Sequence, residues 1–135
     1  MSYSITAIED IDADEVEALK SVGIRTTEKL LEAAKSPKGR KLLAAETKLD
    51  EKRLLRWANI ADKLRIKGMG KEYAGLLYEV GVDTVKELRY RNPGKLAHAM
   101  AELNKKRKLV RFLPSEKLVT RWVENARRLP QKITY

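Results

Sequence analysis

The sequence predicts an all-α fold built from two copies of one helical unit. Apolar residues recur at helical spacing through most of the 135 residues, and alternating apolar and polar runs that would indicate strands are missing. Helix start signals, in which Ser, Thr, Asp or Asn precedes an apolar-periodic segment, occur repeatedly. A third observation is an internal repeat, because residues 58 positions apart match in type.

The repeat divides the chain into a first unit, residues 1–65, and a second unit, residues 66–135. The pairs at an offset of 58 include Ile8 and Ile66, Leu19 and Leu77, Gly23 and Gly81, Thr26 and Thr84, and Leu30 and Leu88. Near the end of each unit Trp57 matches Trp122 at an offset of 65, so the second unit has gained a net seven residues. No Gly/Ser/Pro linker joins the units, and we expect them to pack as one compact helical domain.

In the first unit the pattern predicts helices near residues 13–21, 27–35, 37–46 and 51–64. Asp12 precedes the first helix as an N-cap, and acidic residues follow in the first turn, where the helix dipole favours them. Ser36 and Pro37 give the third helix an N-cap and a proline at its first position.

In the second unit four more helices are predicted near residues 71–80, 85–91, 93–104 and 116–129. Gly81 stands where a helix commonly ends in the left-handed conformation. Thr84 and Glu87 then form a capping box, in which each side chain covers a free backbone N–H group. Pro130 ends the last helix and leaves residues 131–135 as a short tail.

The second hairpin, residues 66–70, carries the most specific motif. Gly68 and Gly70 bracket one apolar residue, and glycine both tolerates positive φ and lets another backbone approach closely. The glycines leave N–H groups uncovered at the start of the next helix, where an anion is favoured. Lys67 and Lys71 flank the turn and add full positive charges. The pattern indicates a turn suited to binding phosphate.

This stretch resembles the helix-hairpin-helix family, whose pattern is an apolar residue, a Gly-apolar-Gly hairpin, a helix, a Gly and a second capped helix. The residues that fill it are Ile66, Gly68, Met69, Gly70, Ala74, Leu77, Gly81, Val82, Thr84 and Leu88. In that family the backbone N–H groups of the hairpin bind a phosphate of a nucleic-acid strand without reading bases. The resemblance implies such contacts here from Lys67, Gly68, Met69, Gly70 and Lys71.

The whole layout also resembles an uncharacterised prokaryotic family with two tandem helix-hairpin-helix units, which implies a SAM/HhH-like fold and no established activity. Some helix-hairpin-helix domains hold a monovalent cation on hairpin carbonyl oxygens. Apart from that ion, the resemblance implies no cofactor.

The first hairpin, residues 8–12, departs from the family pattern. Asp10 and Asp12 stand where the second hairpin has glycines, and a carboxylate there repels a phosphate. No cation occurs before Lys20. We interpret the first hairpin as structural, or as facing a basic partner, and expect no phosphate binding on it.

Positive charge is concentrated in the second unit. The net charge of the chain is +10, and residues 66–135 carry 16 Lys/Arg against 7 Asp/Glu, while residues 1–65 carry 13 against 12. The densest run, named here the basic run, is Lys105, Lys106, Arg107 and Lys108. The apolar residues that follow it are Leu109, Val110, Phe112 and Leu113. We interpret the segment as a loop anchored by these apolar residues that makes a second phosphate contact; the alternative is a solvated helix end, which cations favour.

Features of an enzyme or a metal site are missing from the sequence. There is no cysteine, and the single histidine, His98, has no second histidine for a metal site. No serine has a candidate base near it, and no Gly-rich nucleotide loop occurs. No apolar run approaches the ~18 residues of a membrane helix, and the start MSYSITAIEDID lacks signal-peptide features. We expect no catalytic residue, no metal, no small-molecule substrate, no membrane partner and a cytoplasmic location.

The leading functional prediction is a non-catalytic, sequence-independent module that binds the backbone of duplex or junction DNA through the second hairpin. The alternative is a protein-interaction or scaffolding module, in which the acidic first unit of one copy meets the basic second unit of another. Trp57 and Trp122 lie at equivalent places on apolar helix faces, and we expect both to be buried beneath their hairpins rather than to stack on bases.

Overall fold

Eight α-helices and one short 3-10 helix make up the computed structural model, which describes residues 2–135. In chain order they are η1 (Ile5–Ala7), α1 (Ala13–Ser21), α2 (Thr27–Ala34), α3 (Pro37–Thr47), α4 (Glu51–Lys63), α5 (Lys71–Glu79), α6 (Val85–Arg89), α7 (Pro93–Arg107) and α8 (Glu116–Arg128). Within the described residues, an isolated bridge between Ser4 and Thr26 is the only extended pairing. The all-α prediction is confirmed.

Capping residues start the helices where the sequence predicts. Asp12 Oδ1 accepts a hydrogen bond of 2.8 Å from the N–H of Glu15, and Glu15 Oε1 accepts one of 3.0 Å from the N–H of Asp12. Thr84 and Glu87 close a second capping box at α6, and Ser36 caps α3 ahead of a proline. Each such cap stabilises its helix by about 1 kcal/mol.

Most helix ends lie within one residue of their predicted positions, but α7 is longer than predicted. It continues from residue 104 to Arg107, because Lys and Arg have high helix propensity and cations favour a helix C-terminus. Lys108 then adopts the left-handed conformation, with φ 49°, and ends the helix. The prediction that residues 105–107 form a loop is wrong, and the helix-end alternative describes them.

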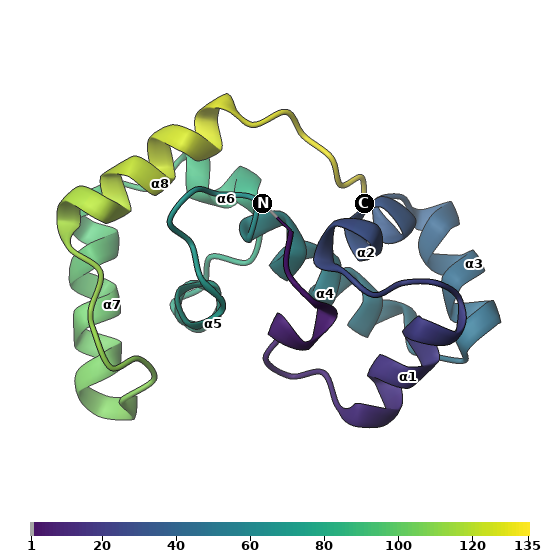
Figure 1. Cartoon of the computed structure of the whole chain (residues 1–135). Coiled ribbons are helices and arrows are strands. Elements are labelled where there is room, and N and C mark those ends of the chain that lie inside the picture. The colour runs from purple at the N-terminus through teal and green to yellow at the C-terminus, as the bar shows by residue number, and fades with distance from the viewer. Residues whose placement is uncertain (1) are drawn as a thin grey trace.

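The two units meet at α4, which packs against α2 and α3 of the first unit and against α5 and α6 of the second. Within the second unit α8 packs against α6 and α7, as Figure 1 shows. One apolar core continues through both units, and it includes Trp57 and Trp122, both 0% exposed. The predictions of a compact domain and of two buried tryptophans are confirmed. None of the helices in residues 2–135 combines the length and the apolar character that crossing a bilayer requires.

Residues 131–135 are a strap rather than a free tail. The segment runs from the end of α8 back to the first unit (Figure 1). There the N–H of Thr134 donates to the carbonyl oxygen of Lys35 at 2.8 Å, and Ile133 is 2% exposed. The strap therefore ties the second unit to the first, in addition to the helix contacts at α4.

Candidate functional site

The second hairpin is anchored by two buried side chains and bends at one glycine. Ile66 and Met69 are 2% and 1% exposed, and the N–H of Met69 donates to the carbonyl oxygen of Ile66 at 3.1 Å. Gly68 has φ +82°, a conformation in which a side chain is strained. Gly70 has φ −95°, which any residue adopts. The turn therefore requires glycine for its conformation at position 68 and not at position 70.

The helix after the second hairpin begins without a side-chain cap. Gly70 is the N-cap of α5, whereas the other seven α-helices of residues 2–135 begin at Ser, Thr, Asp or Asn residues whose side chains accept from the first turn. Among residues 2–135, the backbone N–H groups of Gly68 and Gly70 have no hydrogen-bond partner. Free donors at the positive end of a helix form a place that favours an anion.

A groove, named here the α8 groove, runs between the second hairpin and α8. Its lining residues are Lys67, Gly68, Leu118, Arg121, Glu124, Asn125 and Arg128. The hairpin is fixed to α8 at this place, because the N–H of Lys67 donates to Asn125 Oδ1 at 3.4 Å. The three cations in the lining exceed its one carboxylate, so the α8 groove is positively charged.

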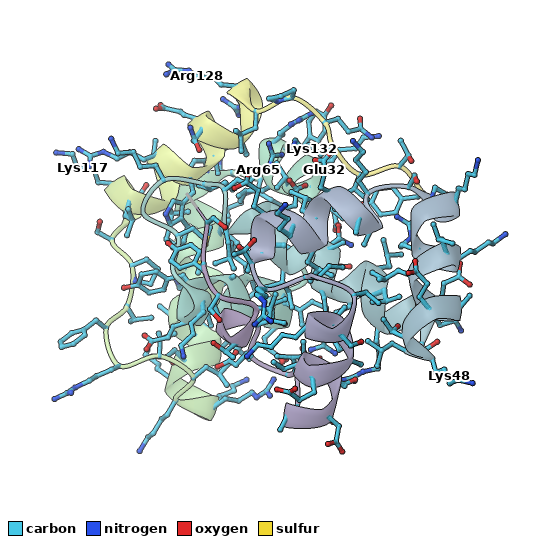
Figure 2. The ribbon with its side chains drawn as sticks, turned by 45° about the vertical axis from the view of Figure 1, so that its right-hand side comes forward. Glu32, Lys48, Arg65, Lys117, Arg128 and Lys132 are labelled. Carbon is cyan, nitrogen blue, oxygen red and sulfur yellow. The ribbon has the colours of Figure 1, made fainter. Side chains whose placement is uncertain are left out.

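The exposed face of α8 extends this basic surface. Lys117, Arg121 and Arg128 are exposed and lie on one face of the helix, with Glu124 between them. Figure 2 shows Lys117 and Arg128 pointing away from the body near the two ends of α8. These cations were not among the predicted site residues, because the prediction for this helix rested on its apolar face alone. Their recurrence at helical spacing opposite that face is the signal that identifies them.

Lys67 and Lys71, predicted to act together, face different parts of the surface. Lys67 lines the α8 groove, whereas Lys71 lines a separate hollow between the units that also contains Glu9, Asp10 and Glu79. The structure thus places Lys67, but not Lys71, in the positively charged groove.

The basic run lies apart from the second hairpin. Arg107 forms an ion pair of 2.7 Å with Glu79, at the C-terminal end of α5, and Lys105 Nζ lies 3.4 Å from Glu102 Oε1. The hairpin is at the opposite end of α5, about 12 Å away at 1.5 Å per residue. The structure therefore does not join the basic run to the hairpin.

The loop after α7 is held by its backbone rather than by all four predicted apolar anchors. Val110 is 7% exposed and Leu109 packs on the core, but Phe112 is 71% and Leu113 is 47% exposed, so the prediction is wrong for these two. Instead, the carbonyl oxygen of Phe112 accepts from Tyr73 Oη at 3.0 Å. Because Tyr73 lies in the first turn of α5, this bond places the loop on the side of the second hairpin.

Arginines of α4 pair with one carboxylate of the first hairpin and with one of α1. Asp10 Oδ1 accepts from Trp57 Nε1 at 3.2 Å, and Asp10 Oδ2 lies 3.1 Å from Arg56 Nε. Arg53 makes two bonds to the Glu15 carboxylate, at 2.7 and 2.8 Å, and donates to the carbonyl oxygen of Asp10 at 3.0 Å. Two of the acidic side chains are therefore neutralised within the first unit.

Residues 9–129, most of the chain, match a domain of unknown function, DUF4332. The chain belongs to the DUF4332 family. The predicted resemblance to an uncharacterised family is confirmed at this level, and the matched range includes the second hairpin and all of α8. No curated protein and no solved structure matches the chain.

The buried titratable groups of this DUF4332 domain lie between the units rather than in the α8 groove. Lys63 is 0% exposed and its Nζ donates to the carbonyl oxygen of Val82 at 3.2 Å. Burial lowers the pKa of Lys63 to about 8, against the opposing effect of Asp83. Burial also raises the pKa values of Asp62 and Asp83. His98 is exposed, and within residues 2–135 no three His, Cys, Asp or Glu side chains are grouped so that they could hold a metal ion.

Proposed function

We propose that the chain is a non-catalytic, sequence-independent DNA-binding module that grips the phosphate backbone through the second hairpin. The observation that carries the proposal is the uncapped N-terminus of α5 next to Gly68, a residue with a free N–H group that lines the positively charged α8 groove. A phosphate requires hydrogen-bond donors and compensating charge, and this place offers both. The proposal assigns no catalytic residue and no small-molecule substrate.

The local geometry also supports the helix-hairpin-helix assignment of the second unit. Buried Ile66 and Met69 hold the turn, α5 follows it, Gly81 ends the helix with φ +94°, and Thr84 caps α6. Backbone donors contact phosphates and carry no information about bases, so the proposed binding is independent of sequence. The cations on the exposed face of α8 would contact neighbouring phosphates of the same strand.

The alternative, a protein-interaction module, is supported by the exposed side chains of Phe112 and Leu113. Head-to-tail pairing of an acidic first unit with a basic second unit is less favoured, since Asp10 and Glu15 already pair with arginines of their own unit. Size exclusion and heparin chromatography at two salt concentrations separate the two functions. DNA binding predicts a monomer whose heparin retention falls with salt, whereas self-association predicts a larger, salt-sensitive species.

The direct test is a mobility-shift assay with duplex, single-stranded and four-way-junction DNA. We expect binding that is equal for unrelated duplex sequences and falls linearly with the logarithm of salt concentration. A slope of about −3 to −5 corresponds to roughly three to six neutralised phosphates. Absence of any shift at low ionic strength would contradict the proposal.

A further inference from the structure

Each unit carries an Arg-Trp pair beside its hairpin, and in the first unit this pair binds a carboxylate. Arg56 and Trp57 of α4 both contact Asp10, with Arg56 Nε 3.1 Å from Oδ2 and Trp57 Nε1 donating to Oδ1 at 3.2 Å. The equivalent residues, 65 positions later, are Arg121 and Trp122 of α8. The donors of the first unit are thus present again in the second.

The carboxylate acceptor has no counterpart in the second unit. The residue that matches Asp10, 58 positions later, is Gly68. Trp122 is 0% exposed, and its Nε1 has no hydrogen-bond partner among the described residues. A buried donor without an acceptor is unfavourable and uncommon in native proteins. A Cβ built on Gly68 would lie 3.7 Å from this nitrogen and 3.4 Å from Leu118 Cδ1, so the position beside the indole has room for a further atom.

The α8 groove beside this nitrogen also carries a free arginine. Gly68 and Arg121 both line the groove, together with Lys67 and Arg128, and Glu124 is the one carboxylate among its described lining residues. Arg121 is exposed and makes no ion pair within residues 2–135. The second unit therefore presents the indole donor and the arginine without the carboxylate that, in the first unit, accepts from the indole and forms an ion pair with the arginine.

We propose that the α8 groove binds a phosphate group whose oxygen accepts from Trp122 Nε1 and pairs with Arg121, in the role that the Asp10 carboxylate has in the first unit. This inference rests on the proposed function and adds two side chains to the backbone donors of the second hairpin. Leu118, which is half-buried, has to rotate for the oxygen to reach the shielded indole nitrogen. A free phosphate ion and a phosphodiester of a nucleic-acid strand share this chemistry.

The two tryptophans provide an internal control for an NMR test on the full chain. The ¹⁵N-labelled protein has two indole N–H resonances, which Trp57→Phe assigns by removing one of them. Inorganic phosphate is titrated first, with sodium chloride at matched ionic strength as reference, and a short DNA duplex is titrated second. We expect the Trp122 resonance to move with both ligands, and the Trp57 resonance to stay, because Asp10 already occupies its donor.

Three variants extend the test without replacing the buried Trp122. Arg121→Gln should weaken duplex binding roughly tenfold, as expected for loss of a charge-assisted hydrogen bond. Arg25→Gln, at an exposed arginine of the first unit, is the matched control and should leave the affinity within about twofold. Asp10→Ala should free the indole of Trp57, so that its resonance becomes sensitive to phosphate.

The outcomes separate this inference from the proposed function. If the duplex binds while the Trp122 resonance stays fixed and Arg121→Gln behaves like Arg25→Gln, the phosphate site is wrong and hairpin-led DNA binding stands. If phosphate moves the Trp122 resonance but no DNA is bound, the site stands and the proposed function fails. Equal movement of both resonances would show a general salt effect and overturn the site.

Discussion

The two hairpins share a backbone conformation at the N-cap but differ in whether a cap is present. Asp12 has φ −93° and ψ 172° at the start of α1, and Gly70 has φ −95° and ψ 173° at the start of α5. The conformation at position 70 thus does not explain its glycine. Glycine at position 70 instead changes the hydrogen bonding. In the first unit the Asp12 carboxylate accepts from the N–H of Glu15, and glycine has no side chain that could accept in this way.

The same substitution of a carboxylate acceptor by glycine occurs twice. Asp10 and Asp12 correspond to Gly68 and Gly70. In the first unit these carboxylates accept from an indole and from the first turn of α1. One scaffold therefore has its donors satisfied internally in one unit and left free in the other. A site for an anion can arise by loss of acceptors, with no new donor added.

The largest change in the free energy of unfolding that we predict concerns Lys63, near the C-terminal end of α4. Its counterpart in the second unit is Arg128, near the C-terminal end of α8. Lys63 is 0% exposed beneath the second unit, while its counterpart Arg128 is exposed in the α8 groove. Below pH 8 the ammonium group of Lys63 is protonated in both folded and unfolded chains, and its burial destabilises the fold. Between pH 8 and about 10 the unfolded chain binds a proton that the folded chain has lost, because the pKa falls from about 10.4 unfolded to about 8 folded. The free energy of unfolding therefore rises with pH there, by on the order of 2–3 kcal/mol in total.

Urea denaturation between pH 7 and 10 measures this rise. Lys63→Met should be more stable than the parent at pH 7 and should lack the rise, whereas Arg128→Met should keep it. The pH series stops at 10 because of Tyr135, whose pKa is raised by burial to about 12. Above pH 10 the unfolded chain releases the Tyr135 proton before the folded chain does. The free energy of unfolding therefore falls there. A rise that persists in Lys63→Met would assign it to other groups.

The helices and caps were predictable because their signals are local. Asp12, Ser36 and Thr84 cap the helices that the sequence assigns to them, and Gly81 adopts the predicted positive φ. The end of α7 was mispredicted because four consecutive cations are typical of a solvated loop, although Lys and Arg also favour a helix C-terminus. Because of this propensity, α7 continues to Arg107.

The candidate site was predictable only in part, because most of it depends on contacts between distant segments. The glycines of the second hairpin could be identified from spacing alone. That Trp122 Nε1 lacks an acceptor depends on how α8 packs against Gly68, 54 positions earlier in the chain. That Lys71 lines a hollow shared with residues of the first unit depends on how the units pack against each other. Neither arrangement has a local sequence signal.

The second prediction removes the carboxylates of the first hairpin. Asp10→Gly with Asp12→Gly should lower the free energy of unfolding by about 2 kcal/mol, since the indole of Trp57 loses its acceptor and α1 loses its cap. The affinity for duplex DNA should rise a few-fold, because two negative charges are removed and donors are freed. Urea denaturation and mobility shift measure the two effects.

The matched control for this variant is Asp10→Asn with Asp12→Asn, which removes the charges but keeps the acceptors. It should retain most of the stability. Unchanged DNA binding in a folded Gly variant would mean that the first hairpin faces away from the nucleic acid.

The third prediction concerns the lysines of the second hairpin. Lys67→Glu with Lys71→Glu should weaken binding to all DNA sequences alike, by roughly tenfold, and flatten the salt slope by about 1 to 2. Because only Lys67 lines the α8 groove, Lys67→Glu alone should have most of this effect. Lys105→Glu with Lys106→Glu is the control. If that pair abolishes binding while the hairpin variants bind normally, the basic run and not the hairpin holds the DNA.

The variant with the smallest expected change in stability, Gly70→Asp, tests the comparison of the two N-caps directly. Gly70→Asp copies Asp12 at a position whose φ is compatible with a side chain and around which an added Cβ meets nothing within 4 Å. The new carboxylate should cap the N–H of Tyr73 and stabilise the fold by a few tenths of a kcal/mol. It also covers the free donors and adds a negative charge, so the affinity for DNA should fall a few-fold.

Stability and affinity are thus expected to change in opposite directions in Gly70→Asp, whereas a variant that damages the fold lowers both. Gly70→Ser separates the two contributions, because serine caps the helix without a charge and should bind DNA with intermediate affinity. Gly68→Asp is the contrasting variant, since φ +82° strains any side chain and predicts lower stability. If Gly70→Asp is more stable than the parent yet binds DNA equally well, the free N-terminus of α5 is not where the phosphate lies, and the difference between the two hairpins has a structural origin alone.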